Sequence, residues 1–80
     1  MKIGTVTGTV RAAKKARCLA EQVFLTVNTP EGEVVAADLV GAASGDEVLL
    51  AMGRAASRYA MEAPVDAAVV AVLENGGAGQ

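Results

Sequence analysis

The run of seven apolar residues from Ala67 to Leu73 constrains the fold more than any other stretch of this chain. No polar residue interrupts it, and a strand that is apolar on both faces has to be covered on both faces. A transmembrane helix needs about 20 apolar residues, so the run is too short to cross a bilayer. Val48–Met52 repeats the pattern over a shorter stretch. We therefore expect two largely covered strands in a chain of only 80 residues.

Threonines alternate with valines and glycine over Lys2–Ala12, and this period of two predicts a first strand. Ile3 is out of phase with the valines that follow it. A kink or bulge at Gly4 or Gly8 would correct the phase, as in strands that curve into a barrel. The polar stretch Ala13–Gln22 is expected to be a loop.

A hairpin is predicted next. Val23–Thr29 alternates in the manner of a strand, and Pro30 followed by Gly32 has the composition of a turn. The third strand is then expected over residues 34–39 or 34–40. The two strands should pair in antiparallel fashion.

The second half of the chain predicts a loop, a strand, a helix and a final strand. Gly41–Asp46 has glycine near both ends and reads as a tight loop before a fourth strand, Glu47–Met52. Gly53 ends that strand, and Arg54–Met61 is rich in good helix formers, enough for one or two turns. Pro64 stops the helix, and the final strand is Ala67–Leu73.

These elements predict a mostly-β fold: a small five-stranded OB-like β-barrel with one short helix before the last strand. A two-layer sandwich or an SH3-like barrel is the alternative. Residues 1–74 are expected to form a single domain, because 80 residues suffice for only one. The Gly-rich residues 75–80 are expected to be a flexible tail.

The sequence contains no recognisable catalytic or metal-binding constellation. It has no histidine and a single cysteine, Cys18, which excludes Ser-His and Cys-His nucleophiles and ordinary zinc sites. The remaining acid–base candidates are carboxylates at predicted strand ends and turns, where such groups usually accept backbone N–H bonds. They are Asp38, Asp46, Glu47, Glu62 and Asp66. We expect no enzymatic activity, no metal and no cofactor.

A binding module for single-stranded nucleic acid or a small ligand is the alternative function. OB-like surfaces that bind single strands stack bases on aromatic residues and line the groove with cations. Only Phe24 and Tyr59 are aromatic here, and the formal net charge is −2. The basic cluster from Arg11 to Arg17 could bind phosphate, but a solvated loop is the interpretation we favour. We expect neither nucleic acid nor membrane as a partner, and no signal peptide directs the chain out of the cytoplasm.

The surplus of aliphatic residues favours self-assembly. Hydrophobic residues make up 52% of the chain, and nearly all are valine, leucine or alanine. A domain of this size buries only about 60% of the surface that its unfolded chain exposes. Apolar surface that a small barrel cannot hide is usually sealed against another subunit.

Three segments in the same order resemble the EutN/CcmL family of bacterial microcompartment shell proteins. The opening Met1–Val10, MKIGTVTGTV, is similar to the family's "MKLGxVxGxV" start. The segment Val35–Asp46, VAADLVGAASGD, resembles its "VAVDxVGAGxGD" motif. The run Ala63–Val72, APVDAAVVAV, resembles its "PVDAAVVGIVD" ending.

The resemblance implies a homopentamer that occupies the vertices of a polyhedral shell. Hexagonal microcompartment shell proteins would be its partners, the shell would lie in the cytoplasm, and the role would be structural.

The resemblance also indicates where subunits should meet. Small residues at 41–45 and 53–57 would let backbones approach closely at subunit boundaries. The family often carries "GSSAR" after the fourth strand, whereas here Gly53–Arg58 is one residue longer, so either Ser57 or Arg58 could take the family's role. The expected interface residues are Asp38, Gly41, Gly45, Gly53, Ser57, Arg58, Val65 and Asp66.

Overall fold

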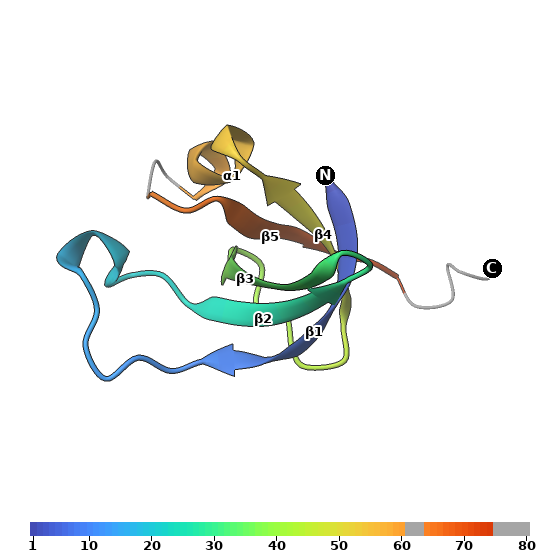
Figure 1. The fold of residues 1–80 in the computed structure, drawn as a ribbon, viewed down its shortest axis with the longest axis horizontal. Helices are drawn as coiled ribbons and strands as arrows, with labels where there is room; N and C mark the ends of the chain where they lie inside the picture. The colour runs from blue at the N-terminus through green and yellow to red at the C-terminus, as the bar shows by residue number, and fades with distance from the viewer. Residues whose placement is uncertain (61–63, 75–80) are drawn as a thin grey trace.

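The computed structural model describes residues 1–60 and 64–74, which form a closed barrel of five strands with one short helix packed outside it (Figure 1). The elements in chain order are β1 (Lys2–Val10), the 3-10 turn η1 (Arg17–Leu19), β2 (Phe24–Thr29), β3 (Gly32–Asp38), β4 (Glu47–Met52), α1 (Arg54–Tyr59) and β5 (Ala67–Val72). The predicted mostly-β, OB-like barrel with a helix before the last strand is confirmed. No helix in the described part of the chain is long and apolar enough to cross a membrane.

The strand order around the barrel is β1-β2-β3-β5-β4. Every neighbouring pair is antiparallel except β3 and β5, which run parallel and pair at Ala37↔Ala68 and Asp38↔Val69. The fifth strand therefore lies between the third and fourth strands and completes the barrel. The predicted hairpin is confirmed, since β2 and β3 pair from Phe24↔Ala37 to Thr29↔Gly32.

The hairpin turn is tighter than predicted. Only Pro30 and Glu31 lie between the strands, so β3 begins at Gly32 and not at residue 34. The Thr29 hydroxyl donates to the Gly32 carbonyl at 2.7 Å, and the Glu31 amide donates to the Thr29 hydroxyl at 3.3 Å. These side-chain bonds draw Gly32, at φ 130°, back against Thr29 and lengthen the strand.

The other element bounds differ from prediction by one or two residues. The first strand ends at Val10, two residues early, and the second begins at Phe24, because the ladder between them starts with the pair Val10↔Phe24. The third strand ends at Asp38, whose side chain turns the chain into the next loop. The helix ends at Tyr59; the rest of its predicted range includes residue 61, outside the described residues. Strand β5 ends one residue early, at Val72.

Strand β1 is shared between two neighbours and bends to reach both. Its first part pairs with β4 and its second part with β2, and the register shifts between Val6 and Gly8. The predicted irregularity at Gly8 is therefore confirmed. Gly4 faces the interior with Val6, which leaves Ile3 on the outside, 53% exposed. A Cβ at Gly4 would lie 2.6 Å from Val27 Cγ1, so only glycine fits this crossing.

The core is built almost wholly from small aliphatic side chains. The barrel interior holds Val6, Leu25, Val27, Ala36, Val48, Leu50, Ala67 and Val69. Outside the barrel, Ala56 of α1 packs on Ala37 and Ala68 and covers the first half of β5. The second half of β5 is open, and Val72 is 44% exposed. The covering predicted for both faces of this strand is thus complete only where the helix lies over it.

Candidate assembly surfaces

Four of the predicted interface residues come together where α1 meets the segment before β5. Gly53, Ser57, Val65 and Asp66 line one surface hollow together with Arg54 and Pro64, and we call this the helix corner. The Gly53 amide donates to the Asp66 carbonyl at 2.8 Å, and Gly53 has φ 65°, which disfavours a side chain there. Arg58 is exposed on the same helix but does not line the hollow.

Asp38 is the last residue of β3, and Gly41 and Gly45 belong to the loop that follows it. The Asp38 Oδ1 atom accepts the backbone amides of Val40, Gly41 and Ala42 at 3.2, 3.0 and 3.2 Å. The Gly45 amide donates to the Val6 carbonyl at 2.8 Å, which ties the far end of the loop to β1. Asp38 therefore holds the loop in shape at one end of the barrel, and Gly45 anchors it at the other.

Of the described carboxylates singled out in the sequence, Asp46 and Glu47 line one surface hollow, whereas Asp38 and Asp66 lie outside it. Asp38 bonds its own loop, and Asp46 Oδ2 accepts the Ala43 amide at 2.9 Å, so the structural interpretation is confirmed for these two. Glu62 lies outside the described residues. Within residues 1–60 and 64–74, no three metal-ligating side chains gather, and Cys18 is free and exposed.

Two apolar hollows carry exposed side chains that the sequence prediction of interface residues missed. The first is lined by Val10, Lys14, Lys15, Leu19, Phe24 and Val35, together with two alanines, and we call it the loop patch. The second is lined by Met1, Lys2, Ile3, Pro30, Glu31 and Leu49, and we call it the hairpin patch. Val35, Ile3 and Met1 are 52%, 53% and 69% exposed. The out-of-phase position of Ile3 pointed to the hairpin patch, and the basic cluster from Arg11 to Arg17 contains Lys14 and Lys15 of the loop patch.

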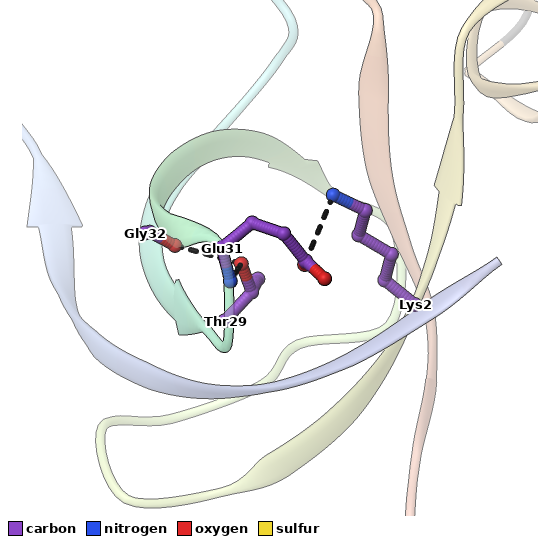
Figure 2. Close-up of polar contacts among 4 residues, drawn as sticks. All are labelled: Lys2, Thr29, Glu31 and Gly32. Carbon is purple, nitrogen blue, oxygen red and sulfur yellow. Dashed lines mark hydrogen bonds and ion pairs between the residues drawn. The ribbon is translucent and has the colours of Figure 1, made fainter.

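The hairpin patch contains an exposed ion pair. Figure 2 shows Lys2 reaching across from β1 to Glu31 in the turn, with Lys2 Nζ 3.2 Å from Glu31 Oε1. The hydrogen bond and the positive charge of Lys2 lower the pKa of the Glu31 carboxyl. This pair is the only salt bridge within the part of the chain that the structure describes.

The loop patch has features that do not favour base stacking. Lys15 Nζ lies 5.8 Å from the centre of the Phe24 ring and donates to the Gln22 carbonyl at 2.7 Å. One face of the ring is therefore occupied by the chain's own ammonium group. Tyr59, the other aromatic residue, is on the helix, so the two rings do not form a joint platform.

Comparison with known proteins gives consistent matches along the described part of the chain. The family model described as "Ethanolamine utilisation protein EutN/carboxysome" matches residues 1–74. The carboxysome shell vertex protein CcmL of Thermosynechococcus vestitus is 39% identical over 83 aligned positions, covering 92% of this chain and 84% of the relative.

Solved structures agree in fold. CcmL of a Nostoc species superposes with a TM-score of 0.83 at 35% identity, covering 94% of this chain and 90% of that one. The pentameric microcompartment shell protein GrpN of Rhodospirillum rubrum gives 0.83 at 29% identity, with coverage of 94% and 95%. The ethanolamine utilization protein EutN of Escherichia coli gives 0.77 at 32% identity, with coverage of 96% and 92%.

Proposed function

Because this chain belongs to the EutN/CcmL family, we propose that it is a structural protein that closes into a ring of five and caps the vertices of a bacterial microcompartment shell. The observation that carries the proposal is the 39% identity to a shell vertex protein over 92% of the chain. The superposition on a pentameric shell protein over 94% of the chain supports the same assembly.

The surface of the single subunit is consistent with a ring. Two separate apolar hollows are open on one small barrel, and exposed aliphatic patches of this kind mark interaction sites. A closed ring uses a heterologous contact, in which two different patches of each copy meet the complementary patches of its two neighbours. A single self-complementary patch would give a dimer instead.

Five-fold rings have a geometric role in a shell. Hexagonal tiles lie flat, and a pentagonal tile introduces the curvature that lets a sheet of them close. The partners of this chain would then be hexagonal shell proteins, and the shell would lie in the cytoplasm. Its role needs no reacting group, in keeping with a structural function.

The helix corner and the loop of residues 39–46 are our proposed close contacts between neighbouring subunits. They contain six of the eight expected interface residues, and small side chains there permit close backbone approach. Arg58, exposed beside the helix corner, would contribute at the edge of such a contact.

Native mass spectrometry of the purified chain at micromolar concentration tests the ring. Five copies of an 8.0 kDa chain should appear as a species of about 40 kDa. A spectrum dominated by the monomer would refute the proposal.

The vertex role is tested by producing hexagonal shell proteins with and without this chain. Electron microscopy should show closed polyhedra when the chain is present and sheets or tubes when it is absent. Polyhedra that close equally well without the chain would refute the vertex role while leaving the ring intact.

A further inference from the structure

Strand register divides the barrel into two ends. The pairs Val10↔Phe24 and Phe24↔Ala37 lie at one end, from which the loop of residues 11–22 projects. The pairs Thr5↔Asn28, Thr5↔Glu47 and Asn28↔Glu33 lie at the other. Figure 1 shows this separation, with the loop extending to the left and the β2–β3 turn at the right.

The loop of residues 11–22 and the opposite end of the barrel carry formal charges of opposite sign, and Asp38 adds one carboxylate beside the loop at the Phe24↔Ala37 end. The loop of residues 11–22 contains Arg11, Lys14, Lys15 and Arg17 against one carboxylate, Glu21, a formal charge of +3. The opposite end, formed by residues 1–5, 27–34, 43–50 and 71–74, contains five carboxylates against Lys2, a formal charge of −4. The five are Glu31, Glu33, Asp46, Glu47 and Glu74.

Most of these charges have no partner of opposite sign within the described residues. The only ion pair there is Lys2–Glu31, so Lys14 and Arg17 at one end and Glu33 and Glu47 at the other are unpaired, and all four are exposed. By register, Glu33, Asn28, Thr5 and Glu47 form one row across four chain segments of the outer surface. Carboxylate groups at one end of the barrel are thus matched by ammonium and guanidinium groups at the other end.

Each end also has an apolar hollow of its own. The loop patch lies at the basic end, with Val10, Phe24 and Val35 in its lining. The hairpin patch lies at the acidic end, with Met1, Ile3 and Leu49 in its lining. Apolar area supplies affinity, while charges around it select the partner and its orientation.

The geometry points to a second copy of this chain as the occupant of both patches: in the proposed ring, the basic loop patch of each subunit docks on the acidic hairpin end of the next. This inference rests on the proposed ring and adds one contact to the close contacts proposed at the helix corner and at the loop of residues 39–46. It explains the direction of the ring, because loop against loop and acidic end against acidic end would each repel.

Charge-reversal variants of the full chain test the contact. The loop variant Lys14→Glu/Arg17→Glu and the hairpin-end variant Glu33→Lys/Glu47→Lys should each raise the protein concentration for half-assembly at least tenfold at low salt. The variant with all four changes carries −1 on the loop and 0 on the hairpin end, so it lacks the repulsion of −1 against −4 in the loop variant and should assemble at a lower concentration than the loop variant does. Native mass spectrometry over a dilution series measures all of them, and circular dichroism checks that the exposed substitutions leave the barrel folded.

The hairpin-end variant also controls for repulsion that arises from the net charge of the whole subunit. It moves the formal net charge of the chain from −2 to +2, so the magnitude is unchanged and only the distribution differs. A defect in that variant which shrinks in 1 M salt therefore reports on the contact itself.

The outcomes separate this inference from the proposed function. A monomeric unmodified chain would refute both. Rings that form in the unmodified chain and are equally stable in both double variants would overturn only the contact proposed here. Loss in both double variants, with the four-fold variant assembling at a lower concentration than the loop variant, supports it.

Discussion

The replacement Gly4→Ala should destabilise the barrel strongly, because Gly4 faces inward where β1 crosses β2. The added Cβ would lie 2.6 Å from Val27 Cγ1 and 2.8 Å from the carbonyl oxygen of Asn28, whereas ordinary contacts begin at 3.4 Å. Val27 is fully buried, and the Asn28 oxygen belongs to the backbone of a paired strand. Neither can yield without disturbing its neighbours.

The loss of folding free energy in Gly4→Ala can be estimated from this crowding. Overpacking of a close-packed core costs about 1–3 kcal/mol, and a clash with backbone as well as a buried side chain places Gly4→Ala near the upper value. Gly8→Ala is the matched control in the same strand. There the new Cβ would lie 3.4 Å from the Thr26 hydroxyl, an ordinary contact. A glycine-to-alanine change without strain stabilises by about 0.4–1 kcal/mol through the unfolded chain.

Urea denaturation of both variants at one protein concentration measures the difference, since association adds to apparent stability. We expect the two free energies of unfolding to differ by about 3 kcal/mol, or midpoints more than about 1 M apart for a typical m-value. Equal midpoints for Gly4→Ala and Gly8→Ala would refute the crossing geometry of β1 and β2.

Three further predictions concern the helix, the β3–β4 loop and the hairpin turn. Ala56→Leu should cost about 1–3 kcal/mol by overpacking the contact of α1 with the barrel, while Ala55→Leu, exposed one residue earlier, should change the urea midpoint little. Asp38→Ala should cost about 1–3 kcal/mol and speed amide exchange in residues 40–42, and Asp38→Asn, which keeps the Oδ1 acceptor, should cost less; equal exchange in both would contradict this. Because the pKa of Glu31 is lowered in the folded state, its stabilisation exists above the ordinary value of 4.5 and disappears as pH falls through the folded value. Urea midpoints of the native chain and Glu31→Gln should therefore differ at pH 7, and the difference should shrink as pH falls below 4.5; a constant difference would refute the role of the Lys2 pair.

Local patterns were sufficient to predict every strand and the helix. Alternation and turn residues fixed the β2–β3 hairpin, and the uninterrupted apolar run located β5. The bounds failed where side-chain chemistry set them: the Thr29 hydroxyl tightened the hairpin turn and moved the start of β3 to Gly32. Such bonds depend on turn geometry that composition does not specify.

Contacts between distant segments were beyond the sequence patterns. The insertion of β5 between β3 and β4 is a pairing between segments far apart in the chain, which periodicity does not encode. Periodicity also could not predict all of the candidate assembly surfaces. Glycine-rich segments indicated the helix corner and the 39–46 loop, but the two apolar hollows became visible only once register placed Ile3 beside Leu49 and Val35 beside Thr26.

The position of β5 between β3 and β4 determines when the barrel can close during translation. Until residues 67–72 leave the ribosome, β3 and β4 each present a bare strand edge, and such edges recruit other chains. The two alanines that begin β5 let it fit against the alanines of its neighbours without displacing a bulky side chain. The barrel can therefore close only after β5 has left the ribosome, and until then the subunit keeps two open strand edges.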